Sequence, residues 1–155
     1  VNPFMQYGWS SLAEEAARLD LAGLIIPDLP LEESPEIEAI LTRHQLDLIQ
    51  LVGLNTSLER LRLHADRARG FVYFVSILGI TGTRNVLSPE LKSKLQQARQ
   101  VFTQPLALGF GLSLPDQVQS IQGSIDAVVF GSALIQHIRQ GGSGGSFLKG
   151  WHTCG

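Results

Sequence analysis

The chain has 155 residues, of which 44% are hydrophobic and 17% charged, and its formal net charge is −2. This composition is that of one soluble globular domain with enough apolar material for a core. The charges are spread along the chain, so no basic stripe or acidic block indicates nucleic acid or a membrane surface as a partner.

Cysteine content and the absence of long apolar runs bear on the cellular compartment. The single cysteine, Cys154, cannot form an internal disulfide and fits a reducing environment. No apolar run approaches the roughly 20 residues of a membrane-spanning helix. The start, Val1 to Phe4, resembles neither a signal peptide nor an initiator methionine, so we expect the natural N-terminus to lie further upstream. We therefore expect a cytoplasmic protein that acts on a small molecule.

Five short apolar runs rich in Val, Ile and Leu recur along the chain without alternating polar residues. Uninterrupted runs of this kind are typical of parallel strands that are buried on both faces. The five predicted strands span residues 23–27, 47–52, 71–76, 105–110 and 126–131.

The segments between these runs have helical spacing and clear start signals. Ser34 and Ser88 are each followed by Pro and Glu, which places a capping hydroxyl, a first-turn proline and an acid in order. Further helix starts are predicted at Ser57 and at Ser113, where Asp116 follows three residues later. Alternating strands and helices predict a parallel sheet built from right-handed crossover units.

Five units allow two folds, which the ligand-binding ends of the strands help to separate. A flavodoxin-like doubly wound sheet fits this length, whereas a full (β/α)8 TIM barrel has eight strands and about 250 residues. The flavodoxin-like fold would carry its phosphate loop after the first strand, where this chain has Pro27-Asp28-Leu29-Pro30 without glycine. Barrels instead form phosphate sites after their last two strands. An incomplete barrel is therefore the preferred fold.

Three glycine-rich strand exits are the candidate ligand site. They contain Gly79 and Gly82, Gly109 and Gly111, and Gly131. Glycine lets successive backbone N–H groups converge on an anion. A helix that begins at Ser132 would add the positive end of its dipole. The last exits together predict a backbone cradle for a phosphate group.

Composition changes near Gly141, where Gly-Gly-Ser-Gly-Gly-Ser begins. Such a stretch is typical of a linker, so we expect a folded domain over residues 1–140 and a flexible tail over residues 141–155. His152 and Cys154 are two possible metal ligands without a second pair, and we predict no metal site.

Six motifs, in order and spacing, resemble the later two thirds of tryptophan synthase alpha chains. The resemblance covers residues 1–138, and six ordered motifs are far more specific than a single glycine pattern. The motifs are Asn2-Pro3-Phe4, Leu24-Ile25-Ile26-Pro27-Asp28-Leu29-Pro30-Leu31-Glu32-Glu33, Gly70-Phe71-Val72-Tyr73-Phe74-Val75-Ser76, Gly79-Ile80-Thr81-Gly82, Gly109-Phe110-Gly111-Leu112-Ser113 and Val129-Phe130-Gly131-Ser132-Ala133.

The resemblance implies a (β/α) barrel in which the five strands are the fourth to the eighth. It also implies a lyase of tryptophan biosynthesis that cleaves indole-3-glycerol phosphate to indole and glyceraldehyde 3-phosphate. The chain itself would need no cofactor. The implied partner is a pyridoxal-phosphate-dependent beta subunit in an α2β2 complex.

The resemblance also implies roles for individual residues. Phosphate would be held by the backbone near Gly82, Gly111, Gly131 and Ser132. The substrate pocket would include Tyr73 and Phe110, and Thr81 would belong to a loop that closes over substrate. In the absence of the family relationship, Tyr73 also fits a packed interior tyrosine and Thr81 a turn-stabilising hydroxyl.

The family's two catalytic acids lie on the second strand and the loop after it, before the point where this chain starts. We therefore assign no catalytic residue, and we expect weak ligand binding and no turnover from the isolated chain. Five units would leave unpaired sheet edges, which predicts a marginally stable or oligomeric chain. The alternatives are another phosphate-binding barrel, or a non-catalytic phosphate-binding or assembly module derived from the barrel.

Overall fold

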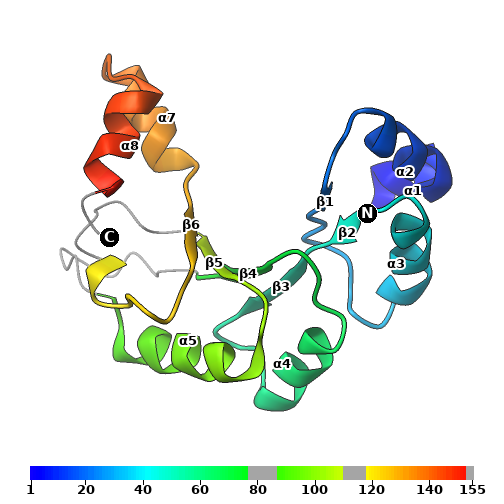
Figure 1. Ribbon diagram of the computed structural model, residues 1–155, viewed down its shortest axis with the longest axis horizontal. Coiled ribbons are helices and arrows are strands. Elements are labelled where there is room, and N and C mark those ends of the chain that lie inside the picture. Colours follow the sequence, from blue (N-terminus) through cyan, green and yellow to red (C-terminus); the bar gives the residue numbers. More distant parts are fainter. Residues whose placement is uncertain (77–86, 110–117, 153–155) are drawn as a thin grey trace.

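The computed structural model describes residues 1–76, 87–109 and 118–152, and it contains parallel strands that alternate with helices. Figure 1 shows the strands in the middle of an open arc, with α3, α4 and α5 along its outer side. The strands are β1 (Gly23–Leu24), β2 (Asp47–Leu48), β3 (Gln50–Gly53), β4 (Val72–Val75), β5 (Leu106–Gly109) and β6 (Ala127–Val129). The helices are α1 (Asn2–Tyr7), α2 (Trp9–Arg18), α3 (Ser34–Arg43), α4 (Leu58–Ala65), α5 (Pro89–Val101), α7 (Ser132–Arg139) and α8 (Gly144–His152).

Each strand pairs in parallel with the next one along the chain. β1 pairs with β2, and the second sheet has the order β3-β4-β5-β6. β2 and β3 form one predicted strand that is interrupted at Ile49 and changes partner there from β1 to β4. A flavodoxin-like sheet would reverse its strand order near the first strand, so that alternative is wrong. The fold is part of a (β/α)8 barrel, and in the described residues β1 and β6 each pair on one side only.

The larger hydrophobic core lies between the four-stranded sheet and helices α4 and α5, and we name it the C-terminal cluster. Alternate residues of the strands point to this side of the sheet, as the period of two requires. Phe74, Leu91 and Leu106 are fully buried within it. Its buried members are Val52, Leu61, Ala68, Val72, Phe74, Leu87, Leu91, Leu95, Ala98, Phe102, Leu106, Leu108 and Ile121.

A second core, named the N-terminal cluster, lies between helices α2 and α3 and the short strands β1 and β2. Trp9 packs against it and lies 5.9 Å from Phe4, measured between ring centroids. Its buried members are Ala13, Ala16, Ile26, Ile37, Ile40, Leu41, Leu46 and Leu48. Each cluster thus has its own tryptophan, because Trp151 packs against the C-terminal cluster.

The predicted cap at Ser88 is confirmed, Ser57 caps the helix that was predicted to start there, and the cap predicted at Ser34 is wrong. Ser57 and Ser88 accept hydrogen bonds from the third residue after them, at 3.2 Å and 3.1 Å. Ser34 is instead the first residue of α3, because Glu33 occupies the capping position. The Ser34 hydroxyl is turned into the structure, 2.9 Å from the Leu31 carbonyl oxygen. The cap predicted at Ser113 lies outside the described residues.

Residues 141–152 differ from the flexible tail that their composition predicts. They form a Schellman turn and helix α8. Gly141 has a φ of 88°, its N–H bonds to the Ile138 carbonyl, and the Gly142 N–H bonds to the His137 carbonyl, which is the Schellman pattern. Ser143 and Ser146 then cap α8 reciprocally, each backbone N–H donating to the other's hydroxyl at 3.0 Å and 3.1 Å.

Candidate functional site at the strand exits

A cavity of about 1010 Å³ lies at the carboxyl ends of the strands. Its strand residues Leu51, Tyr73 and Val75 alternate with members of the C-terminal cluster, so they lie on the opposite face of the sheet. In a (β/α)8 barrel this end carries the active site. The walls are formed by Ile25, Pro27, Leu51, Val52, Gly53, Leu54, Asn55, Thr56, Arg60, Tyr73, Val75 and Val129. A mostly apolar cavity with a few polar groups is typical of a small-molecule site.

The Tyr73 ring forms part of the cavity wall and packs directly on the backbone of Gly109. A Cβ atom at position 109 would lie 2.0 Å from the Tyr73 hydroxyl and 2.3 Å from Cζ. Gly109 also accepts hydrogen bonds at its carbonyl from the Ser76 backbone N–H at 3.0 Å and the Ser76 hydroxyl at 3.1 Å. Burial raises the pKa of the Tyr73 phenol, so the group stays neutral. Gly109 is therefore glycine because a tyrosine ring occupies the place of its side chain.

Two of the predicted phosphate-binding residues are described. Gly131 is the capping residue of α7, which begins at Ser132 as the sequence predicts. Both residues are exposed, and a Cβ at Gly131 would meet nothing within 4 Å. The first N–H groups of a helix lack partners within the helix, so this end can accept an anion. Gly82, Thr81, Phe110 and Gly111 lie outside the described residues.

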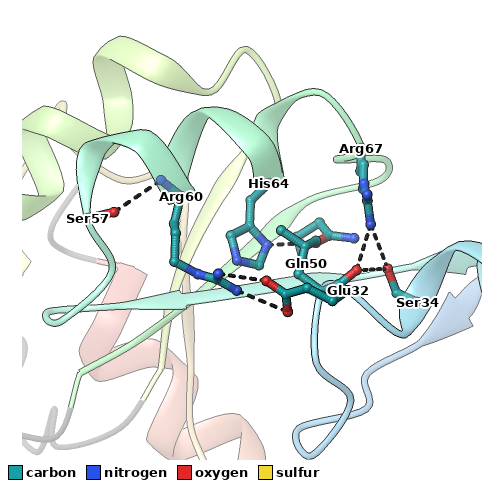
Figure 2. A network of polar contacts seen from close by, with 8 residues as sticks. Glu32, Ser34, Gln50, Ser57, Arg60, His64 and Arg67 are labelled. Carbon is teal, nitrogen blue, oxygen red and sulfur yellow. Dashed lines mark hydrogen bonds and ion pairs between the residues drawn. The ribbon is translucent and has the colours of Figure 1, made fainter.

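A polar network joins the exit loop of β1 to helix α4 (Figure 2). The Arg60 guanidinium donates to both carboxylate oxygens of Glu32, at 2.7 Å and 3.4 Å. This contact lowers the pKa of the Glu32 carboxyl. Arg67, two turns further along the chain, donates to the Leu31 carbonyl oxygen at 2.7 Å and to the Ser34 hydroxyl at 3.1 Å. Because Arg60 also lines the cavity, this network fixes one wall of the candidate site.

The same network continues through Gln50, which is buried at the start of β3. The Gln50 amide nitrogen donates to Glu38 at 3.4 Å, and its amide oxygen lies 2.8 Å from Nδ1 of His64. Burial lowers the pKa of His64, and the nearby cations Arg60 and Arg67 lower it further. We call this network the polar seam; its members are Glu32, Ser34, Glu38, Gln50, Arg60, His64 and Arg67.

Sequence reasoning missed the polar seam. Part of the signal was present, since Arg60 and His64 are four residues apart and therefore share one face of α4, whereas Arg67 follows the end of that helix. An amphipathic helix normally buries its apolar face, and α4 buries Leu61 against the C-terminal cluster. Its second, polar contact face has no apolar periodicity that would reveal it.

None of the helices in the described part of the chain is long and apolar enough to cross a membrane. Within the same residues, no three side chains of His, Cys, Asp or Glu are grouped so that they could hold a metal ion.

Comparison with known proteins identifies the family. The family model for the tryptophan synthase alpha chain matches residues 1–146. The alpha chain of Solidesulfovibrio magneticus is 52% identical over 150 residues, which cover 97% of this chain and 59% of that protein. The alpha chain of Nitratidesulfovibrio vulgaris is 48% identical over 151 residues. The chain thus spans about 59% of the length of these relatives.

Solved structures agree with the sequence relatives. The alpha chain of Legionella pneumophila superposes with a TM-score of 0.81 at 28% identity, covering 99% of this chain and 59% of that one. The Pyrococcus furiosus tryptophan synthase a2b2 complex contains a chain that superposes with a TM-score of 0.82 at 31% identity, covering 90% of this chain and 56% of that one. The resemblance carried by the six motifs is confirmed, and the chain belongs to the tryptophan synthase alpha chain family.

Proposed function

We propose that this chain is part of a carbon–carbon lyase that cleaves indole-3-glycerol phosphate to indole and glyceraldehyde 3-phosphate in tryptophan biosynthesis. The observation that carries the proposal is the family match over residues 1–146. The cavity at the strand exits supports it, because its apolar walls and the Tyr73 ring suit an indole group.

The phosphate end of the substrate would bind at the last strand exits. Gly131 and Ser132 offer backbone N–H groups at the start of α7, where the helix dipole favours a dianion. Gly82 and Gly111 complete the proposed cradle, with Phe110 beside it and Thr81 in the closing loop. Val129 lines the cavity two residues before Gly131, so the apolar and phosphate parts of the site are adjacent along the chain.

The reaction itself needs groups that we do not assign to this chain. Retro-aldol cleavage requires a proton for the indole carbon that leaves and a base for the glycerol hydroxyl as its carbonyl forms. Two carboxyl groups in different environments commonly divide such work. We propose that they belong to the barrel units outside this chain, so the isolated chain turns over nothing measurable.

A beta subunit is the proposed partner of the whole protein. The support is that one structural neighbour belongs to an a2b2 complex of tryptophan synthase. Pyridoxal phosphate would be bound only by that partner, and the alpha chain would need no cofactor.

The proposal is tested by completing the barrel. This chain is joined to the part of the Solidesulfovibrio magneticus alpha chain outside the matched stretch, and indole release from indole-3-glycerol phosphate is measured. We expect indole from the chimera and none from the isolated chain. In the chimera, Gly131→Asp should raise KM at least about tenfold, because a carboxylate would repel the phosphate. A folded chimera that releases no indole would overturn the lyase assignment.

A further inference from the structure

The exit of β6 is followed by a helical hairpin whose second helix returns to the strand end. Phe130 lies between β6 and Gly131, and three aromatic rings meet there. The Phe130 ring lies 4.1 Å from the Trp151 ring and 5.2 Å from the Phe147 ring, and Phe147 and Trp151 are 5.9 Å apart, measured between centroids. Phe147 and Trp151 are four residues apart on α8, so they share one helix face.

The hairpin that brings these rings together is constrained at several points. His137 of α7 lies 2.8 Å from the Ser146 hydroxyl through Nε2 and 5.5 Å from the Phe147 ring. A Cβ at position 142 would come within 2.1 Å of the same His137 nitrogen, so glycine lets the His137 ring pack closely against the chain there. Together with the reciprocal caps of Ser143 and Ser146, these contacts set the position of α8 against α7.

Phe130 and Val129 point to opposite sides of the strand. Val129 lines the cavity at the strand exits, whereas Phe130 lines a separate cavity of about 420 Å³ with Leu148 and Trp151. A ring held on one side of a strand end limits the conformations of its own residue, and so fixes the point from which the following residue starts. Gly131 is that residue, and it has no side chain of its own that could fix its direction.

The described residues provide few other contacts that would hold this segment. Helix α7 buries none of its residues, and Gly131 makes no side-chain cap. β6 has three residues, of which Ala127 and Val129 are exposed. The aromatic contact with α8 is therefore the main packing interaction next to the start of α7.

We propose that Phe130, held by Phe147 and Trp151, is a positioning residue that orients the Gly131 and Ser132 N–H groups for phosphate. Helix α8 then sets the affinity of the phosphate site without touching the ligand. This inference rests on the proposed function, because it assumes phosphate binding at Gly131 and Ser132.

The test uses the chimera with the completed barrel, because the isolated chain is expected to bind ligands weakly, with glycerol 3-phosphate as the probe and amide chemical shifts in NMR spectra as the readout. We expect titration to move the Gly131 and Ser132 amide signals. Trp151→Ala should weaken the fitted Kd at least about fivefold, whereas Trp151→Phe should restore most of the affinity because it keeps a ring. Ile138→Ala, at a position 51% exposed on α7, is the matched control and should leave Kd unchanged.

A second variant guards against loss of folding in Trp151→Ala. Phe147→Leu keeps apolar volume but removes one ring, and it should give an intermediate Kd and faster hydrogen exchange of the Gly131 amide. Equal Kd values in the parent chimera, Trp151→Ala and Phe147→Leu would overturn the inference while the phosphate site stands. No shift of Gly131 or Ser132 in the parent chimera would overturn the phosphate site itself, and the inference with it.

Discussion

The two hydrophobic clusters are built from different elements, and polar contacts lie at the junction between them. The C-terminal cluster is a four-stranded sheet covered by α4 and α5, and its strands pair over their full length. The N-terminal cluster is mainly helical, with two strands of two residues each. The junction between them consists of the chain at Ile49 and the polar seam (Figures 1 and 2). Apolar burial thus forms each cluster, whereas the junction combines hydrogen bonds and ion pairs with the buried side chain of Ile49, which belongs to neither cluster.

The largest expected effect comes from removing a core side chain in one cluster only. Phe74→Ala should cost about 3–5 kcal/mol and Leu41→Ala about 2–5 kcal/mol, because both side chains are buried. Urea unfolding is followed by tryptophan fluorescence in Trp9→Phe and Trp151→Phe backgrounds, so that each cluster has one reporter. Phe74→Ala should lower the Trp151 midpoint more than the Trp9 midpoint, and Leu41→Ala should do the reverse. Equal displacement of both midpoints would show that the two clusters unfold as one cooperative unit.

A smaller effect is expected from breaking the polar seam at its buried centre. Gln50→Ala removes the partner of His64 and the weaker of two partners of Glu38, which keeps its hydrogen bond from Ser34, and this should cost about 1–3 kcal/mol. It should also separate the two fluorescence midpoints, because the clusters lose part of their connection. Gln96→Ala, at an exposed position on α5, controls for loss of a glutamine and should change stability by less than about 0.5 kcal/mol. Midpoints that stay together in Gln50→Ala would argue against the seam as the link.

Removing a helix cap should affect the two clusters to different extents. Ser57→Ala and Ser88→Ala should each cost about 1 kcal/mol, since each removes an acceptor for a first-turn N–H. Ser57 caps α4, and Arg60 and His64 of this helix belong to the polar seam, so Ser57→Ala should lower both midpoints. Ser88 caps α5, which packs only on the C-terminal cluster, so Ser88→Ala should lower mainly the Trp151 midpoint. Ser93→Ala within α5 is the control for a serine that caps nothing.

The smallest expected effect is a dependence of stability on pH. The folded pKa of His64 lies below the ordinary value of 6.5, so the unfolded chain binds the proton more readily. The contribution of His64 to stability is therefore complete above 6.5, falls as the pH drops toward the lowered folded pKa, and is constant below it. His64→Gln should reduce the slope of the urea midpoint in that pH window, with His44→Gln as control. An unchanged slope in His64→Gln would contradict the assignment.

Much of the fold follows from the sequence because parallel strands buried on both faces leave a simple apolar signal. Each of the five predicted runs contains a strand in the structure. In residues 23–27 the strand has only two residues, and in residues 47–52 it is interrupted at Ile49. Helix α8 was not predicted because the glycine and serine content conceals a Schellman turn, a reciprocal cap and two aromatic residues on one helix face. The seam was missed because polar contacts between distant segments leave no periodic pattern in any one of them.

The candidate site was only partly accessible to sequence reasoning. The start of α7 at Ser132 could be predicted from the strand exit and the helical spacing after it. The position of Arg60 at the cavity could not, because it depends on the path of the exit loop of β1. The phosphate-binding and pocket roles of individual residues remain predictions that the experiments above address.

The contact between Tyr73 and Gly109 makes their evolution interdependent. Any side chain at position 109 would occupy the volume of the ring at position 73, so a larger residue 109 requires either a smaller residue 73 or a ring that turns away from the strand. Across an alignment of the family, we expect these columns to covary, with an aromatic residue at one paired with glycine at the other. Frequent co-occurrence of tyrosine with a larger residue at position 109 would show that the backbone can move apart there.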